Sequence, residues 1–350
     1  MVEDIRNFTL SELEGKFKAL KIPPYRARQV FEWLYKKGAQ DFALMTNLPQ
    51  DVKNTLQQYF IIGEIHLEKI ETSTDLTQKF LFRLSDDLLI ESVSIPFKSR
   101  LTVCLSTQVG CKFSCAFCAS GLAGFKRNLS VSEILSQALT IRKNIPEGKI
   151  SNIVFMGVGE PLDNYDNLLK AIRIMNAELG IRLGIRKMTI STAGLVPAIE
   201  RLAKEGLQLE LSVSLHAATD EKRNEIMPIN KRFPLKTLLE AVRLYSTASK
   251  RKITFEYVLL GGYNTSVEDA QGLIKLLRGL NACVNLIPYN PTHGRIRFQA
   301  PTKLEVLFFK SYVSKKGIDV TWRMPRGGDI AAACGQLKYN TLKKREKNEA

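Results

Sequence analysis

The sequence predicts an α/β protein in which a partial (β/α) barrel follows a small helical segment and a short run of β-strands. From Leu101 onward, short apolar stretches alternate with amphipathic stretches of about 10 to 15 residues, which is typical of parallel βα units. Residues 1–60 carry apolar side chains at three- and four-residue spacing, which indicates helices. The length of 350 residues fits about two domains.

The N-terminal residues 1–62 are expected to form a helical accessory domain. Apolar spacing predicts helices over residues 12–20 and 25–37, and Pro23-Pro24 separates them. Two roles stay open for this domain, namely docking of a substrate and structural packing alone. Residues 63–98 then alternate apolar and polar side chains, which predicts a β-strand extension with strands over 64–70, 79–84 and 88–95.

Residues 99–337 are expected to form the barrel, and residues 338–350 a basic, disordered tail. In a barrel of this kind, active-site residues lie at the carboxyl ends of the strands. The predicted strands cover residues 101–106, 153–156, 186–191, 208–215, 253–259, 284–288 and 319–323, and the clearest helices cover 131–143, 167–179, 235–246 and 266–277.

The charge of the chain favours a polyanionic partner. Lysine and arginine total 51 against 35 acids, for a net charge of +16, and neutralising phosphates with such residues releases counterions. A generally basic surface would explain the composition equally well. The chain contains no apolar run of about 18 residues and begins with an acidic rather than an apolar segment, so we expect a cytoplasmic protein without a membrane helix.

Three of the six cysteines form a metal-binding pattern. Cys111, Cys115 and Cys118 follow a predicted strand at C-x3-C-x2-C spacing, and three thiolates so close together suit a soft metal or an iron–sulfur cluster. A 4Fe–4S cluster held by three cysteines leaves one iron open for a ligand. The alternative is a structural zinc, with Cys104 as its fourth thiolate. Cys283, at the start of a predicted strand, is expected in the core.

The motifs around these cysteines resemble those of the RlmN/Cfr family of radical S-adenosylmethionine (SAM) RNA adenine methyltransferases, and most of all its RlmN branch. The resemblance runs in order from Glu91 to Leu337. Small departures at Ser120, Val158, Gly328 and Ala331 remove no reactive group. The matching motifs include Cys111–Cys118 with Phe117 before its last cysteine, Met156-Gly157-Val158-Gly159-Glu160-Pro161, Ser214-Leu215-His216, Met227-Pro228-Ile229-Asn230, and Gly328-Asp329-Ile330-Ala331-Ala332-Ala333-Cys334-Gly335-Gln336-Leu337.

The resemblance implies a partial (β/α) radical-SAM barrel and a set of cofactor-binding residues. It makes Cys111, Cys115 and Cys118 the cluster ligands, with SAM bound at the open iron. The residues that it implies for contacts to SAM are Gly159, Glu160, Ser191, Ser214, Leu215, His216 and Asn290. Taken alone, the glycine-rich segment is a tight turn, and the polar residues are capping or turn residues at strand ends.

The resemblance also implies three catalytic residues. Cys334 becomes an S-methylcysteine that carries the methyl group, and a second SAM in each turnover generates the radical. Cys104 resolves a covalent protein–RNA adduct and leaves a transient disulfide with Cys334. Glu91 acts as general base. If the resemblance is set aside, the sequence suggests only that Cys334 lies in a close-packed turn and that Glu91 is an exposed acid on a strand face.

Three functions therefore compete. The first is methylation of adenosine carbon 2 in 23S rRNA at the peptidyl-transferase centre and in certain tRNAs at the base after the anticodon, or, in a Cfr-type enzyme, of carbon 8 in the rRNA. The second is a radical-SAM enzyme acting on a peptide or small molecule. The third is a zinc-stabilised RNA-binding protein without catalytic activity. For the first, we expect a monomer and an electron donor such as flavodoxin or ferredoxin.

Overall fold

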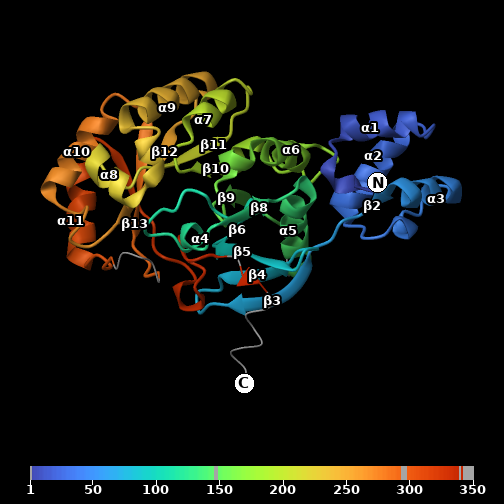
Figure 1. Ribbon diagram of the computed structural model, residues 1–350, viewed down its shortest axis with the longest axis horizontal. Helices are drawn as coiled ribbons and strands as arrows, with labels where there is room; N and C mark the ends of the chain where they lie inside the picture. The colour runs from blue at the N-terminus through green and yellow to red at the C-terminus, as the bar shows by residue number, and fades with distance from the viewer. Residues whose placement is uncertain (1, 146–148, 293–297, 339, 342–350) are drawn as a thin grey trace.

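A computed structural model describes residues 2–145, 149–292, 298–338 and 340–341 (Figure 1). A sheet of eleven strands forms the centre of this part of the molecule. The predicted basic tail lies almost wholly outside the described residues. No helix in the described ranges is long and apolar enough to cross a membrane.

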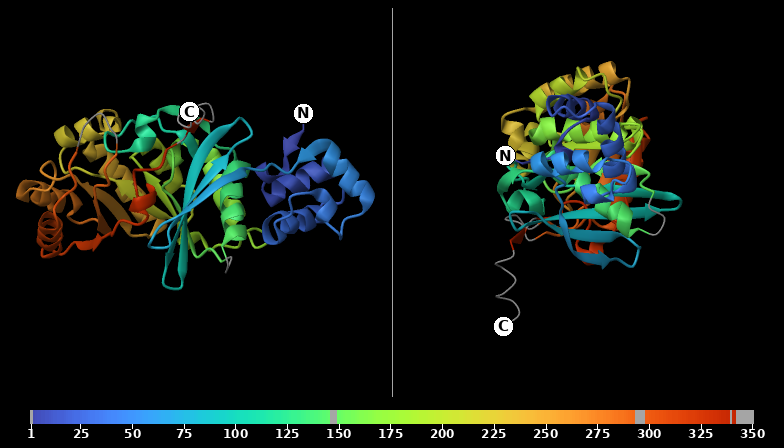
Figure 2. Two further views of the ribbon diagram at one scale, coloured as in Figure 1. Left: turned by 90° about the horizontal axis from the view of Figure 1, so that it is seen from below. Right: turned by 90° about the vertical axis from the view of Figure 1, so that its right-hand side faces the viewer.

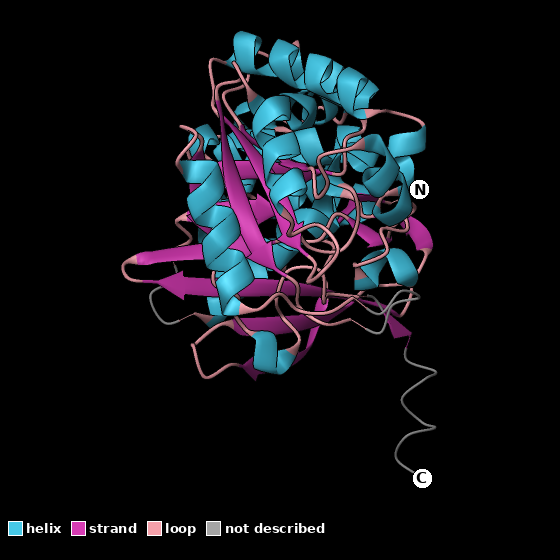
Figure 3. Cartoon of the chain, turned by 90° about the vertical axis from the view of Figure 1, so that its left-hand side faces the viewer, coloured by secondary structure: helices cyan, strands magenta, loops and turns pink. Residues whose placement is uncertain are grey.

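Seven parallel strands in chain order form the predicted partial barrel, which the structure confirms. Each strand pairs with the next, and within the described chain the first strand and the last strand do not close onto each other. The strands are β6 (Arg100–Cys104), β9 (Asn152–Phe155), β10 (Met188–Thr192), β11 (Glu210–Ser214), β12 (Ile253–Leu259), β13 (Ala282–Pro288) and β14 (Asp319–Trp322). Figure 3 shows the strands beneath a layer of helices.

Helices connect these strands, as the strand–helix alternation predicts. Four of them were expected, namely α5 (Val131–Asn144), α6 (Tyr165–Asn176), α9 (Leu235–Ser249) and α10 (Val267–Leu277). Three others are shorter or less amphipathic, and no bounds were predicted for them from the sequence. They are α7 (Val196–Ala203), α8 (Asp220–Ile226) and α11 (Lys303–Ser314). The start of α5 is fixed by a capping box, in which Ser130 and Glu133 satisfy each other's backbone N–H groups.

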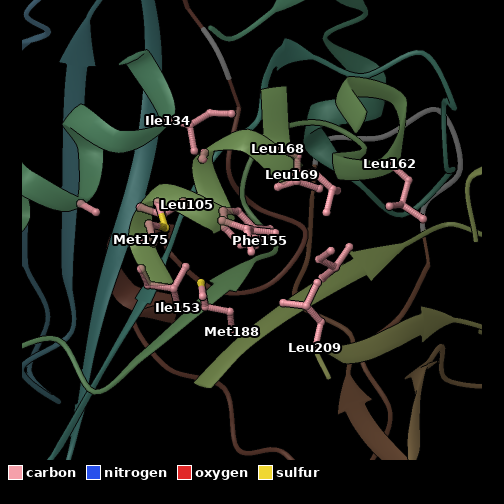
Figure 4. Packing of buried hydrophobic residues seen from close by; sticks show 14 of the residues in the cluster. Leu105, Ile134, Ile153, Phe155, Leu162, Leu168, Leu169, Met175, Met188 and Leu209 are labelled. Atoms are coloured by element: carbon pink, nitrogen blue, oxygen red, sulfur yellow. The ribbon is translucent and has the colours of Figure 1, made fainter. Parts of the chain in front are cut away.

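The main core lies between the parallel strands and their helices. Ile153 and Phe155 of β9 face Leu168 and Met175 of α6, and all four side chains are fully buried (Figure 4). Alternate residues of a strand point to the same face of its sheet, so Ile153 and Phe155 both lie on the helix-covered face of β9. This packing holds the strand ends that carry the candidate site.

The N-terminal segment lies at one end of the elongated molecule, against α5 and α6 (Figures 1 and 2). Its helices are α1 (Leu10–Ala19), α2 (Tyr25–Glu32), which a π turn continues to Lys37, and α3 (Gln50–Tyr59). Two short strands, β1 (Glu3–Asp4) and β2 (Phe60–Ile61), pair in parallel and were not predicted. Arg142 of α5 donates to the carbonyl of Tyr35 at 2.7 Å, and Lys170 of α6 pairs with Glu12 at 2.7 Å.

Three antiparallel strands extend the sheet beyond β6, as predicted for residues 63–98. They are β3 (His66–Thr72), β4 (Gln78–Arg83) and β5 (Leu88–Phe97). Val93 of β5 pairs with Cys104 of β6, which joins this extension to the barrel. Short elements after β6 and β14 complete the fold, namely β7 (Gln108–Gly110), α4 (Ala119–Leu122), β8 (Phe125–Asn128) and β15 (Asn340–Thr341), which pairs with β5.

Candidate functional site

A cavity of about 160 Å³ lies at the carboxyl ends of the barrel strands. Larger clefts occur elsewhere, but none of the predicted site residues lines them. The predicted residues that line this cavity are Cys111, Cys115, Cys118, Gly159, Glu160, Ser191, Ser214, His216 and Cys334. Leu215, Asn290, Cys104 and Glu91 do not line it.

The cysteine loop is held in shape by backbone hydrogen bonds. The N–H of Cys118 donates to the carbonyl of Cys115 at 3.1 Å, and the N–H of Ala116 donates to the carbonyl of Ile226 at 2.9 Å. Phe113 and Phe117 pack on a small apolar cluster that includes Ile226 and Met227. The loop is therefore positioned by residues from the far side of the barrel.

The three thiols have the chemistry that an iron–sulfur cluster requires. They are free and line one cavity. Burial raises the pKa of Cys111 to about 12 and that of Cys115 well above its ordinary value, so their thiolate forms need a positively charged partner such as iron. Cys104 does not line this cavity, and in the described residues no set of three or more His, Cys, Asp or Glu side chains is arranged for a single metal ion. The structure thus offers no support for a four-thiolate zinc site.

Glu160 lies at the turn after β9 and is 3% exposed. Its Oε2 accepts the N–H of Ala193 at 2.7 Å, and its Oε1 accepts the N–H of Leu162 at 3.2 Å. Burial raises the pKa of Glu160 to about 7. The side chain of Thr192 also hydrogen-bonds to Glu160. The buried carboxylate remains a strong acceptor for a cationic group in the cavity.

The glycines before Glu160 are required by packing within the protein. A Cβ on Gly157 would lie 2.7 Å from the carbonyl oxygen of Leu105. A Cβ on Gly159, whose φ is +108°, would lie 2.5 Å from the Cβ of Gln108. Gln108 in turn accepts the N–H of Glu160 at 2.8 Å. The observed reason for these glycines is the close approach of the chain that follows β6.

A buried polar network connects this turn to the rest of the sheet. Ser106 Oγ accepts the N–H of Val158 at 2.8 Å and donates to the carbonyl of Glu91 at 2.6 Å. Gln137 of α5 bonds both backbone groups of Ser106, at 2.9 and 3.1 Å. Ser106 and Gln137 are fully buried, so these bonds form in a low-dielectric environment and fix the turn firmly.

His216 is held as a neutral side chain. Its Nδ1 accepts the N–H of Val258 at 2.9 Å, and burial lowers its pKa to about 3. The proton is therefore on Nε2, which leaves an N–H donor on a ring that lines the cavity. The ring packs edge-on against Phe117, with a centroid separation of 4.7 Å. The side chain of Leu215 is fully buried, so only its backbone can serve a ligand.

Arg223 of α8 is a site residue that the sequence analysis missed. It is 1% exposed and donates to the carbonyls of Ala193, Ser214 and Leu215 at 2.7 to 3.0 Å. These carbonyls belong to the turns after β10 and β11. Asn230 accepts a further bond from Arg223 at 2.7 Å, which gives the Met227–Asn230 motif a physical role.

Cys334 lies in the loop after β14, with an exposed thiol. Cys104 is 8% exposed, and burial together with the nearby Cys334 raises its pKa to about 12. Both cysteines are free thiols. Asn290 Nδ2 lies 3.4 Å from the carbonyl oxygen of Cys334, to which it donates. Arg323 was not predicted, yet it lines the cavity, and the interaction with Cys334 raises its pKa.

Glu91 is buried, and the alternative interpretation of it as an exposed acid on a strand face is therefore wrong. It is 6% exposed, and burial raises its pKa. Its Oε2 accepts the N–H of Lys338 at 3.0 Å, so it touches the segment that carries Cys334. Cys283, expected in the core, is only half-buried; it contacts Thr254 at 3.5 Å and does not line the cavity.

Two family models match the sequence. Residues 105–277 match the radical SAM superfamily, and residues 3–62 match the ribosomal RNA large subunit methyltransferase N-terminal domain. The first match covers the cysteine loop and the barrel strands β9 to β12, and the second covers the helical N-terminal segment.

Similar proteins extend over nearly the whole chain. The dual-specificity RNA methyltransferase RlmN of Geobacter sulfurreducens is 44% identical over 335 residues, which are 96% of this chain and 92% of that protein. A probable enzyme of the same name from Geobacillus thermodenitrificans is 45% identical over 97% of this chain and 93% of its own length. The crystal structure of a radical SAM methyltransferase from Sphaerobacter thermophilus superposes with a TM-score of 0.91 at 41% identity, covering 96% of this chain and 99% of that chain.

Proposed function

The chain belongs to the RlmN family of radical-SAM RNA methyltransferases, and from that premise we propose that it methylates carbon 2 of adenosine in two kinds of RNA. The proposed targets are 23S rRNA at the peptidyl-transferase centre and certain tRNAs at the base after the anticodon. The relatives are named dual-specificity RNA methyltransferases, which supports two kinds of substrate. The observation that carries the proposal is the single cavity that gathers the three loop cysteines, the polar residues at the strand ends and Cys334.

The family implies a 4Fe–4S cluster and SAM. We propose that Cys111, Cys115 and Cys118 hold one cluster with an open iron, and that Glu160 accepts from the amino group of SAM. Ser191, Ser214, His216 and the backbone of Leu215 and Gly159 would bind the rest of SAM. When bound, the reduced cluster supplies the electron that converts SAM into a 5′-deoxyadenosyl radical. Two SAM molecules are used in each turnover.

Cys334 is proposed as the methyl carrier. Its thiol is exposed at the cavity, and its segment is flexible enough in composition, with Gly327, Gly328 and Gly335, to bring the sulfur to a bound base. A thiolate is the nucleophilic form of cysteine. The base must leave its stack to reach this sulfur, at a cost of a few kcal/mol.

Glu91 and Cys104 are proposed to finish the reaction. Glu91 removes a proton from the adduct carbon, and Cys104 then attacks the sulfur of Cys334. A sulfur–sulfur bond forms while the bond between the Cys334 sulfur and the methylene carbon on the base breaks. The electron pair of the broken bond stays with the base, and the methylene carbon takes up a proton and becomes the methyl group. The placement of Cys104 supports this role, because it belongs to the buried cluster to which Ala332 and Leu337, on either side of Cys334, also contribute.

The proposed function also leads us to expect a particular localisation, oligomeric state and electron donor. We expect a cytoplasmic monomer that receives electrons from a flavodoxin or ferredoxin. Because the chain belongs to the RlmN family, the two competing functions lose their support. These were a radical-SAM enzyme acting on a peptide or small molecule and a zinc-stabilised RNA-binding protein. Carbon 8 methylation is the alternative that the following experiment separates from carbon 2.

The test is an anaerobic assay with a reductant, SAM labelled with deuterium on its methyl group, and unmodified fragments of 23S rRNA or tRNA. Mass spectrometry of the digested RNA should find labelled 2-methyladenosine together with 5′-deoxyadenosine. Labelled 8-methyladenosine would overturn the carbon assignment, and unlabelled RNA with 5′-deoxyadenosine would overturn the substrate. In Cys104→Ala, RNA should stay covalently bound to the protein, and its absence would refute the role of Cys104.

A further inference from the structure

The segment that carries Cys334 is held by the β-strand extension. We call residues 327–338 the Cys334 loop. Asp329 accepts the hydroxyl of Ser73 at 2.6 Å and the N–H of Thr74 at 3.2 Å. Asp75 accepts the N–H of Gly327 at 3.2 Å. The turn between β3 and β4 therefore fastens the start of the loop.

A second attachment connects both sides of the loop to one ion pair. Lys79 of β4 donates to the carbonyl of Ile330 at 2.6 Å, and Glu91 of β5 accepts the N–H of Lys338 at 3.0 Å. Ile330 lies four residues before Cys334 and Lys338 four residues after it. Lys79 and Glu91 are themselves 3.6 Å apart. One lysine–carboxylate pair thus holds the loop symmetrically around its reactive cysteine.

The surroundings make this pair more than a surface contact. The side chains of Lys79 and Glu91 are 11% and 8% exposed. Lys79 also pairs with Glu71 of β3 at 2.9 Å. Hydrogen bonds to charged groups are stronger than neutral ones, and removing one partner leaves the other buried without compensation.

We propose that Lys79 is a positioning residue that holds the Cys334 loop over the sheet and couples it to Glu91. The inference rests on the proposed function for its catalytic meaning. Lys79 touches neither the cavity nor the reacting atoms, so it acts through Ile330 and Glu91. Its bond to Ile330 helps to set where Cys334 stands, together with the bond from Asn290 to the carbonyl of Cys334. Its positive charge favours the ionised, proton-accepting form of Glu91.

The apolar contacts of the loop are too few to replace this attachment. The loop contributes Ala332 and Leu337 to a small buried cluster whose sheet members include Val93 and Cys104. This cluster is separate from the main core. Segments with few buried apolar contacts open at low free energy, so the position of Cys334 depends on polar contacts.

The test uses the full chain with its cluster and compares Lys79→Met with Lys69→Met. Lys69 is a matched control, because it also pairs with Glu71, at 2.7 Å, but its side chain is 53% exposed and no hydrogen bond connects it to the loop. Lys79→Met should raise amide hydrogen exchange in residues 327–338 about tenfold, and Lys69→Met should not. Lys79→Arg should restore protection. Equal exchange in the two Met variants would overturn the positioning role.

Catalysis supplies the second measurement. In Lys79→Met, kcat should fall about tenfold while the Kd for SAM stays unchanged, since the cavity residues are untouched. The groups that face Glu91 are Lys79 from β4 and Lys338 from the loop, and Glu71 from β3 faces Lys79. Loss of Lys79 raises the pKa of Glu91, so the acidic limb of the pH–rate profile should move to higher pH. A general loss of structure would not cause this shift.

The two levels of the proposal can fail separately. If the profile does not move, the coupling to Glu91 is overturned. If the wild-type enzyme methylates no RNA but exchange in the loop still depends on Lys79, the proposed function fails and the positioning role stands.

Discussion

The cysteine loop after β6 and the Cys334 loop after β14 meet at one cavity, but they are held in different ways. The cysteine loop is bound by backbone bonds on both sides, packs two aromatic rings on a buried cluster, and follows a strand of the main core. The Cys334 loop contributes only the buried Ala332 and Leu337 and the half-buried Ile330 to the small cluster on the sheet. Its other attachments are hydrogen bonds, both from the β-strand extension and from α4, which directly follows the cysteine loop. In α4, Ser120 donates to the carbonyl of Leu337 at 2.6 Å, and the N–H of Ala119 donates to the carbonyl of Gly335 at 2.8 Å.

This difference matches the work that each loop is proposed to do. A cluster and its SAM must stay at a fixed geometry, and a rigid strand end provides it. A cysteine that receives a methyl group, delivers it to RNA and then reaches a second cysteine must change position. Polar contacts at a loop are the ones that can open at low cost. The following experiments test whether the two loops are independent in this sense.

The largest effect is expected from removing the reactive sulfur of each loop. Cys334→Ala and Cys115→Ala should both lower RNA methylation by on the order of 10³-fold or more. Iron content and 5′-deoxyadenosine formation should persist in Cys334→Ala and disappear in Cys115→Ala. Iron and acid-labile sulfide assays with product analysis check this. Loss of the cluster in Cys334→Ala would show that the cysteine loop depends on the Cys334 loop for its structure, which would contradict their independence.

The next effect concerns the free energy of unfolding. Leu168 and Leu337 are both buried, but Leu168 belongs to the main core and Leu337 to the small cluster under the Cys334 loop. Leu168→Ala should lower the global free energy of unfolding by about 3 to 5 kcal/mol. Leu337→Ala should lower it by about 1 kcal/mol or less while raising hydrogen exchange in residues 327–338, because the loop opens before the protein unfolds. Chemical denaturation of both variants measures the free energy of unfolding. Similar losses in the two variants would contradict the independence of the two loops.

A smaller effect is expected from acidification. The pKa of His216 is about 3 in the folded protein against an ordinary 6.5. The unfolded chain therefore binds more protons below pH 6.5, and stability falls as the pH falls from 6.5 towards 3. Between pH 6.5 and 5 this loss amounts to about 2 kcal/mol. His216→Asn, which suits the left-handed φ of +60° at this position, should remove that part of the pH dependence.

Urea denaturation at both pH values measures this difference in the cluster-free protein. His66 is exposed on β3, so His66→Gln should keep the pH dependence of the wild type. A pH dependence that is equal in all three proteins would mean that His216 is protonated in the fold, and the assignment of its proton to Nε2 alone would be wrong.

The smallest effect is expected at the edge of the extension. Ser73→Ala removes the hydroxyl that donates to Asp329. The loss is about 1 kcal/mol, so exchange in residues 327–330 should rise about fivefold, with the cysteine loop unchanged. Ser85→Ala, at an exposed turn of the same extension, serves as the control. A rise in exchange in the cysteine loop as well would show that the attachments of the two loops are linked.

Sequence patterns were sufficient to predict those parts of the structure that depend on residues close together in the chain. Strand–helix alternation predicted the seven parallel strands, and their carboxyl ends carry Glu160, Ser214 and His216 as expected. The spacing of Cys111, Cys115 and Cys118 indicated an iron–sulfur site. Such patterns survive in the sequence because periodicity and ligand spacing are local properties of the chain.

Only the tertiary structure showed the residues that support the site from a distance. Arg223, Arg323 and Lys79 sit in unremarkable sequence contexts, and the bond from Lys79 to Ile330 spans 251 residues. The same holds for the glycines at 157 and 159, whose missing side chains make room for Leu105 and Gln108.

By itself, then, the sequence determined the class of fold and the family, and it predicted the residues that are proposed to carry the chemistry. Packing decided which buried side chains fix the turns, that Glu91 is buried against the Cys334 loop, and how firmly each loop is held. The physical reason is that hydrogen bonds and burial depend on which distant segments meet. That meeting is set by the whole sheet and its helices, and no local pattern records it.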